Sequence, residues 1–187
     1  MPLTPADRAD TLLFYLQLAN APITRDQATL QQRFFCAYPR SFAEMVALFG
    51  YDDGTGAAPL YDENQGTEVI AYFGGLSAIP DSLYYDKYIR LCIDGHWQAD
   101  HIRGAFGLGE QLLNERRTAV AGLGRFSDAD VHSIFAFLFD GPHPDHAANT
   151  QLYERLRIAL DKQDARLSQL LTSAYREMLQ HHDQHGH

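Results

Sequence analysis

The sequence predicts an all-α protein, in which eight or nine helices pack as one orthogonal or bundle-like domain over residues 1–180. Two observations lead to this fold class. Helix-start signals recur along the chain, and each is followed by apolar residues spaced three and four positions apart. Strict alternation of apolar and polar residues, the pattern of a half-buried strand, does not extend over any useful length. At 187 residues, the chain can bury the core that such a domain needs.

Capping signals place three helices in the first fifty residues. A helix begins after a residue whose side chain accepts a backbone N–H, and an acid or amide three positions later completes the capping box. The chain offers Thr4 with Pro5 and Asp7, Thr24 with Gln27, and Ser41 with Glu44. Residues 51–66 then hold three glycines, one proline and four acids, so we expect the longest loop there.

The remaining helices are expected at a second set of signals. These are Thr67, Asp81 or Ser82, the glycine-weakened stretch after Trp97, Ser127 with Asp130, and Asn149 or Thr150. Residues 131–139 are apolar nearly all round, which predicts a central helix. Residues 161–164 either bend the last helix or divide it in two. The His-rich residues 181–187 are expected to form a flexible tail.

Negative charge is concentrated in the middle of the chain. The net charge is −9, and residues 51–100 contribute nine acids against two bases. Such a field repels nucleic-acid phosphates and anionic membranes and attracts basic partners. The chain has no cationic and then apolar signal segment at its start, and no apolar run long enough to span a bilayer. A cytoplasmic protein that binds neither nucleic acid nor membrane is therefore expected.

Motifs for nucleophilic or nucleotide chemistry are not found. Cys36 and Cys92 lie among apolar residues, and we expect both to be buried without a disulfide. Residues 104–109 read G-x-x-G-x-G, the reverse of the dinucleotide fingerprint, and no strand is expected before them.

Histidines and aspartates form the clearest candidate for a metal site. They fall in two sets, first His96, Asp100 and His101, then His132, Asp140 and His143. An imidazole and a carboxylate four apart share a helix face and can bind zinc or another divalent ion. The two sets resemble the ligand sets of the metal-dependent HD phosphohydrolases. The signature of that family is an adjacent His-Asp pair, and the reversed order here, Asp100-His101, removes most of the resemblance. A metal-dependent α-helical hydrolase remains one hypothesis.

The same stretch, residues 93–104, is also typical of a corner between two helices. Gly95 ends one helix, and Asp94 or His96 caps the next, with Asp100 in its first turn, where the helix dipole favours a negative charge. Trp97 then anchors the corner by burying its large ring. Incomplete ligand sets mostly arise by chance, so we favour the corner, with His96 and Asp100 facing outward.

Between residues 41 and 146 lie the stretches SFAEMVALFGYD, LYDENQGTEVIAYF, KYIRLCIDGHWQADHI and IFAFLFDGPHP. Their layout resembles that of small, all-helical bacterial immunity proteins, which are encoded beside secreted toxins that include type VI secretion effectors. The resemblance implies a non-catalytic inhibitor that needs no cofactor and binds one cognate toxin.

An acidic surface that carries tyrosines suits such a role. Tyrosine beside acid is typical of protein-binding surfaces and equally typical of the rim of a core. Negative charge steers association with a basic toxin. The expected partner-binding residues are the acids Asp52, Asp53, Asp62, Glu63, Asp94 and Asp100 with the anchors Tyr51, Tyr61 and Trp97. A homodimeric scaffolding domain is a third hypothesis.

Overall fold

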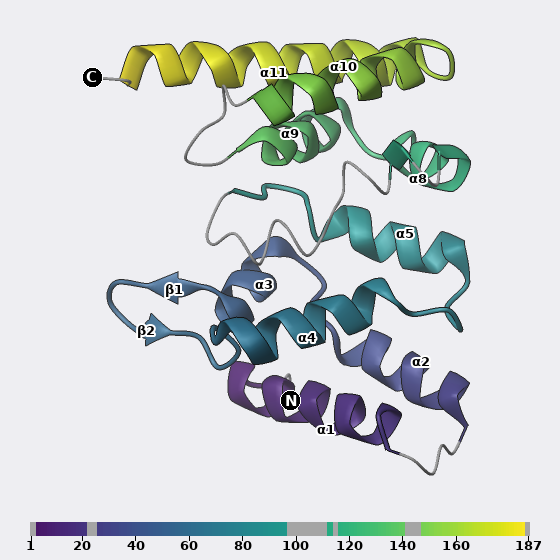
Figure 1. Ribbon diagram of the computed structural model, residues 1–187, viewed down its shortest axis with the longest axis vertical. Coiled ribbons are helices and arrows are strands. Elements are labelled where there is room, and N and C mark those ends of the chain that lie inside the picture. Colours follow the sequence, from purple (N-terminus) through teal and green to yellow (C-terminus); the bar gives the residue numbers. More distant parts are fainter. Residues whose placement is uncertain (1–2, 22–25, 97–111, 114–115, 141–146, 186–187) are drawn as a thin grey trace. The chain divides into compact units, whose positions relative to one another are not determined.

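The computed structural model of the chain describes residues 3–21, 26–96, 112–113, 116–140 and 147–185. Within them lie nine α-helices and one hairpin of two-residue strands, which confirms the all-α prediction (Figure 1). None of the described helices is both long and apolar enough to cross a membrane. The chain forms two compact units: the described parts of Met1–Lys87 build the first, and the described parts of Tyr88–Trp97 and Gly107–His187 build the second. The domain boundary expected at residue 180 stays a prediction.

The first unit contains four complete helices, the hairpin and the start of a fifth helix. In chain order these are α1 (Pro5–Ala19), α2 (Gln27–Ala37), α3 (Phe42–Phe49), β1 (Tyr51–Asp52), β2 (Gly56–Ala57), α4 (Glu63–Gly74) and α5 (Asp81–Arg90). Helix α1 packs against α2, α3 and α4. The core is rich in aromatic rings: Tyr38 stacks on Phe73 with 4.0 Å between ring centroids, and Phe73 stacks on Tyr84 at 5.2 Å. Such pairs contribute beyond the apolar area that they bury.

Three of the predicted helix starts are confirmed. The side chains of Thr4, Ser41 and Ser127 each accept the backbone N–H of the residue three positions later. Only Thr4 is part of a complete capping box, because Glu44 does not reach back to Ser41. Its carboxylate instead accepts from Arg8 Nη1 at 2.7 Å, which ties α3 to α1.

Three predicted helix starts are wrong. Helix α10 begins at Ala147, so Asn149 and Thr150 lie within its first turn and do not cap it. At the other two starts, an aspartate next to the helix supplies the cap. Helix α2 begins after Asp26, whose carboxylate accepts the backbone N–H of Thr29 at 3.2 Å, and the predicted cap, Thr24, lies outside the described residues. Helix α4 begins after Asp62, so the turn that Thr67 was expected to cap lies within the helix. The loop expected over residues 51–66 is therefore shorter and contains the hairpin.

Lys87 on α5 completes the C-terminal end of α2. Its Nζ donates to the backbone carbonyls of Phe35 and Tyr38, the latter at 2.7 Å, and lies 4.6 Å from the centroid of the Phe35 ring. The last carbonyls of a helix lack intrahelical partners and favour a cation. Burial lowers the pKa of Lys87 to about 8, because the ammonium group is partly removed from water.

Helix α9 is the centre of the second unit, which confirms the prediction made from its apolar sequence. The helices here are α8 (Arg116–Leu123), α9 (Asp128–Phe139), α10 (Ala147–Asp161) and α11 (Ala165–His185). Six residues of α9 are buried: Val131, Ile134, Phe135, Phe137, Leu138 and Phe139. Helix α11 packs on α9 and on α10. The flexibility expected for residues 181–187 stays a prediction.

Residues 162–164 divide the last segment into two helices and do not merely bend it. The two helices lie side by side in Figure 1. The carboxylate of Asp164 accepts the backbone N–H of Leu167 at 3.1 Å, which satisfies a free donor at the start of α11. Local capping therefore decides between the two possibilities that the sequence left open.

The stretch after α5 docks against α9. Asp94 adopts a left-handed backbone with φ of 55°, and its N–H donates to the Ser133 hydroxyl at 3.1 Å. Gly95 lies so close to the Phe137 ring that a Cβ atom would come within 2.6 Å of it. The helix ends at Arg90, before the glycine that was expected to break it. Trp97, the expected anchor, lies outside the described residues.

The two cysteines have different environments. Cys92 is fully buried as expected, but Cys36 is exposed, so that prediction is wrong; both thiols are free. Phe34 on α2 and Tyr38, the C-cap of this helix, are buried. Cys36 is two positions from each of them, which places it on the opposite side of the helix. The apolar residues that flank Cys36 in sequence therefore do not bury it.

Candidate functional site

The hairpin between α3 and α4 displays part of the expected partner-binding surface. Helix α3 ends at Gly50, and the strands pair antiparallel with Tyr51 opposite Ala57 and Asp52 opposite Gly56. Gly56 has a φ of 82°, a left-handed conformation that other residues adopt only with strain. A glycine at the start of β2 therefore lets the chain leave the turn in this conformation, and Tyr51, opposite Ala57, is exposed.

Tyr61 is held in place by its neighbours in sequence. Leu60, just before it, is fully buried, and its N–H donates to the Leu48 carbonyl at 2.8 Å. Asp62, just after it, caps α4 by accepting the N–H groups of the next turn. Gly66 packs so tightly here that a Cβ atom would lie 2.5 Å from the Leu60 carbonyl oxygen. Tyr61 thus projects from a fixed backbone.

These constraints bring Tyr51 and Tyr61 together on the surface. Their ring centroids are 5.6 Å apart, and the ring planes are inclined at 51°. The residues remain 51% and 38% exposed, respectively. We call Tyr51 and Tyr61 the tyrosine pair. Aromatic anchors that are exposed and held in one geometry are common where proteins bind other proteins.

An apolar hollow adjoins the tyrosine pair. It has a volume of about 510 Å³ and lies between α3, the hairpin and the start of α1. Small side chains line most of it, and Tyr51 forms part of its wall; the lining residues are Pro5, Ala43, Val46, Ala47, Gly50, Tyr51, Thr55, Gly56, Ala57, Ala58 and Pro59. We call this the hairpin hollow. Together with the tyrosine pair it offers a partner a concave apolar surface.

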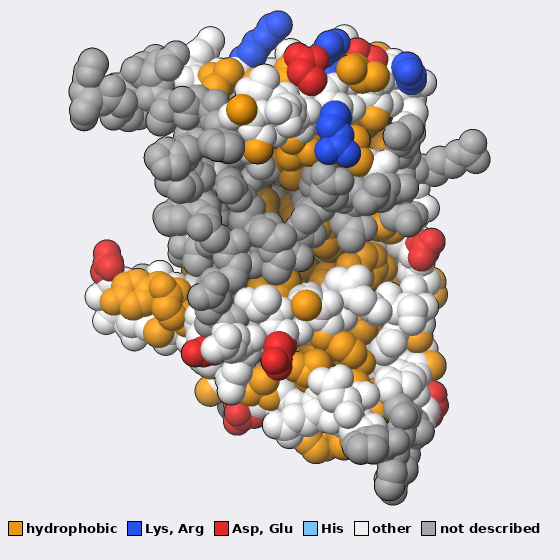
Figure 2. All heavy atoms as spheres, viewed as in Figure 1, with side chains coloured by type: hydrophobic (Ala, Val, Ile, Leu, Met, Phe, Trp, Pro, Cys, Tyr) orange, Lys and Arg blue, Asp and Glu red, His pale blue; other side chains and the backbone are white. Residues whose placement is uncertain are grey.

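The exposed charged groups that are described on the hairpin and at the start of α4 are acidic, whereas the cation Arg8 on α1, one turn from Pro5, is paired with Glu44 of α3. Asp53, in the hairpin turn, is exposed, and so is Asp62, although Asp62 also caps α4. No lysine or arginine occurs in the sequence between Arg40 and Lys87. Figure 2 shows hydrophobic side chains gathered on the hairpin with an acidic side chain beside them, whereas the Lys and Arg side chains visible in that view lie over α10 and α11. The surface therefore favours a cationic partner.

The other expected partner-binding residues are not all placed on this surface. Asp52 lies in β1 and Glu63 begins α4, but their side chains are not described. Asp94 is exposed in the second unit. Trp97 and Asp100 lie outside the described residues. The structure therefore brings together Tyr51 and Tyr61 and leaves the contributions of the other residues as predictions.

The expected metal ligands that are described have other contacts. His96 is exposed, and its Nδ1 lies 3.3 Å from the Asp94 carbonyl oxygen. His132 Nε2 lies 3.4 Å from Glu177 Oε1, and Asp140 is the C-cap of α9. In the described parts of the chain, no three His, Cys, Asp or Glu side chains are grouped as metal ligands. Asp100, His101 and His143 lie outside those parts, so the complete set stays a prediction.

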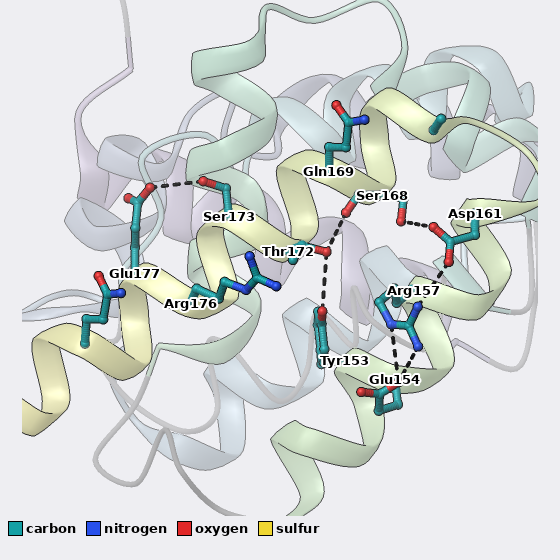
Figure 3. Close-up of a pocket in the computed structure, with 12 residues that line it drawn as sticks. Tyr153, Glu154, Arg157, Asp161, Ser168, Gln169, Thr172, Ser173, Arg176 and Glu177 are labelled. Carbon is teal, nitrogen blue, oxygen red and sulfur yellow. Dashed lines mark hydrogen bonds and ion pairs between the residues drawn. The ribbon is translucent and has the colours of Figure 1, made fainter.

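A second hollow, which the sequence analysis did not anticipate, lies between α10 and α11 (Figure 3). This groove has a volume of about 760 Å³ and is lined by Tyr153, Glu154, Arg157, Asp161, Ala165, Ser168, Gln169, Thr172, Ser173, Arg176, Glu177 and Gln180. The polar positions of α11 recur at intervals of three and four, which is a signal that could have identified its groove face from sequence.

The polar side chains of this groove bond to one another. The Tyr153 hydroxyl donates to Thr172 Oγ1 at 3.3 Å, and the buried Ser168 hydroxyl donates to the Asp161 carboxylate. Arg157 bridges two carboxylates, at 2.9 Å from Glu154 and 3.2 Å from Asp161, and its hydrogen bond with Glu154 raises the pKa of the guanidinium. The groove is thus a polar seam that joins α10 to α11.

Comparison with known proteins yields no relatives for this chain. No protein-family model matches it, and no curated protein and no solved structure matches it significantly. The resemblance to immunity proteins therefore stays a prediction, and the candidate sites are supported by physical chemistry alone.

Proposed function

We propose that the protein is a non-catalytic immunity protein, which neutralises a cognate toxin by binding a basic part of the toxin's surface. The observation that carries this proposal is the tyrosine pair, two exposed rings fixed beside an apolar hollow and exposed acids. Fixed aromatic anchors lose little conformational entropy on binding, and the acids around them accelerate encounter with a basic partner. Neither the rings nor the hollow requires a catalytic group to act.

Inhibition by such a surface is steric and electrostatic. A toxin that acts on nucleic acid or nucleotides has a basic substrate groove, and an acidic protein bound there excludes the substrate. Asp53 and Asp62 supply the negative charge, and the tyrosine pair supplies the contact area. The metal-dependent hydrolase and the homodimeric scaffold stay alternative predictions.

The proposal is tested by co-expression with the product of the adjacent gene. The expected result is a stable complex on size-exclusion chromatography and restored growth of cells that express the toxin. Substitution of Tyr51→Ala with Tyr61→Ala should weaken binding by about 10- to 100-fold, the range expected when central aromatic anchors are removed. Asp53→Lys should slow association, most clearly at low ionic strength.

Two matched variants serve as controls. Phe14 on α1 is 55% exposed, so Phe14→Ala removes an equally exposed ring at another place on the first unit. Asp10, also exposed on α1, provides the charge control as Asp10→Lys. Both controls should bind as the parent protein does. If no complex forms and the cells are not protected, the immunity function is refuted. If Phe14→Ala weakens binding as much as the double substitution of Tyr51 and Tyr61 does, the tyrosine pair is not the binding surface.

A further inference from the structure

We infer that the tyrosine pair and the hairpin hollow together form a receptor for one arginine side chain of the partner. This inference rests on the proposed function, because it names the chemistry by which the same surface recognises its partner. It depends on three features of the same part of the first unit: an apolar hollow, two exposed tyrosine rings, and exposed acids close to these tyrosines in sequence.

The hollow fits the apolar part of a long cationic side chain. Its lining is dominated by alanine, valine and proline side chains, which offer no charge to a ligand. Arginine and lysine bury their methylene stems against such surfaces while the charged head stays at the edge. Tyr51 is both a wall of the hollow and one ring of the tyrosine pair. A stem in the hollow therefore brings its head group to the rings.

The rings suit a cation at that position. The face of a tyrosine ring carries partial negative charge and attracts a guanidinium or ammonium group within about 6 Å of its centroid. Two rings inclined at 51° with centroids 5.6 Å apart present two such surfaces at different angles. The same interaction occurs elsewhere in this chain, where Arg90 lies 5.2 Å from the centroid of the Phe126 ring.

Charge then favours arginine over neutral ligands, and shape favours it over lysine. Asp53 and Asp62 are exposed near the pair in sequence, and the chain has no basic residue from 41 to 86. Guanidinium is planar, stacks on aromatic faces and is more weakly hydrated than ammonium, so it loses less on leaving water. Lysine should therefore bind more weakly, and an uncharged side chain of the same shape more weakly still.

The experiment titrates the full chain with the blocked tripeptides Gly-Arg-Gly, Gly-Lys-Gly and Gly-citrulline-Gly. Citrulline has nearly the shape of arginine but no charge. The readout is the ring-proton NMR shifts of Tyr51 and Tyr61, assigned with Tyr51→Phe and Tyr61→Phe. We expect saturable shifts with the arginine peptide, a dissociation constant on the order of millimolar, and binding of the citrulline peptide weaker by about fivefold or more.

Variants show where the peptide binds. Tyr51→Leu and Tyr61→Leu should reduce the advantage of arginine over citrulline toward onefold, whereas Phe14→Leu should leave it unchanged. Circular dichroism confirms that each variant remains helical. Equal binding of arginine and citrulline peptides, or shifts of the Tyr51 and Tyr61 rings that do not saturate, would overturn the inference, and so would lysine binding as tightly as arginine.

The outcome is separable from that of the proposed function. If the arginine peptide saturates the tyrosine pair but no toxin forms a complex, the receptor stands and the immunity function fails. If a toxin binds and protects cells but the tripeptides leave the tyrosine pair unchanged, the immunity function stands and the arginine receptor fails.

Discussion

The hairpin surface and the groove between α10 and α11 handle their polar groups in opposite ways. In the groove, Arg157 is shared by Glu154 and Asp161, and the Ser168 hydroxyl is bonded to a carboxylate. At the hairpin, two aromatic rings and the carboxylate of Asp53 lie open to water. The groove has the larger volume, yet its charges already have partners within the unit.

The difference teaches that volume alone is a poor guide to a binding surface. A ligand that enters the groove must compete with hydrogen bonds that join α10 to α11 and with ion pairs within α10, and breaking them costs stability. A partner that covers the tyrosine pair removes the exposed area of two aromatic rings from water, which favours association. We therefore expect substitutions in the groove to lower the stability of the fold, and substitutions at the tyrosine pair to weaken the binding of a partner.

The largest expected effect on stability is at the buried end of the groove. Ser168→Ala removes the hydroxyl that donates to Asp161, a hydrogen bond to a charged group, and should lower the free energy of unfolding by about 1.5–3 kcal/mol. Urea denaturation measures the change. Ser173→Ala is the matched control on the same helix, because Ser173 is exposed and should cost less than about 0.5 kcal/mol. An equal loss of unfolding free energy in the two variants would contradict the claim that the Ser168–Asp161 hydrogen bond stabilises the contact between α10 and α11.

A smaller effect is expected at Lys87, the partly buried cation of the first unit. Its pKa is lowered to about 8 by burial, whereas an unfolded lysine keeps its proton to about 10.5. Between these values the unfolded state binds more protons, so the free energy of unfolding should rise with pH above about 8. Solvent at this partly exposed site limits the rise to about 1 kcal/mol by pH 9.5.

The control for this rise is Lys87→Met, which removes the titrating group. Urea denaturation of both proteins at several pH values from about 7 to 9.5 makes the comparison. The parent protein should become more stable across this window, and the variant should show a flatter profile. A rise of the same size in Lys87→Met would show that another group is responsible.

At the tyrosine pair, substitution should affect folding less than it affects binding. Tyr51→Ala removes a ring that is half exposed and should change the free energy of unfolding by less than about 1 kcal/mol. Thermal denaturation of Tyr51→Ala beside Phe14→Ala measures the difference between two rings of similar exposure. If Tyr51→Ala lowers the free energy of unfolding as much as Ser168→Ala does, the tyrosine pair belongs to the core. The two regions would then no longer differ in how substitution affects stability.

The smallest effect is expected for the exposed ion pair of the groove. Glu154→Gln removes one carboxylate from Arg157 at a surface position and should cost about 0.2–1 kcal/mol. The difference between parent and variant should shrink in about 1 M salt, because ions screen exposed charges. A difference that persists in high salt would mean that Glu154 stabilises the seam by packing.

Much of the local structure could be predicted from sequence, because the signals act within one helical turn. Thr4, Ser41 and Ser127 cap helices as their spacing predicts. The same reasoning failed at Thr67, because Asp62 provides an earlier cap in a stretch whose glycines and acids indicated a loop. It failed at Cys36 because apolar neighbours in sequence do not reveal which side of a helix faces the core.

The candidate surface could be predicted only in part. Composition indicated that acids and tyrosines lie between residues 51 and 100, and it named Tyr51 and Tyr61. It gave no reason for these two rings to touch, because they lie ten positions apart in a stretch without a periodic pattern. The polar groove was missed because its two walls come from different helices, and Tyr153 meets Thr172 only after the chain turns back.

The sequence by itself therefore determined the all-α class, the caps at Thr4, Ser41 and Ser127, and the central place of α9, because each depends on side chains within a few residues of one another. Tertiary structure decided what the polar groups do. It placed Lys87 on the carbonyls of α2 and Ser168 beside Asp161, and it set Tyr51 against Tyr61 at the surface. These contacts join residues that only packing brings together, and local preferences do not encode them.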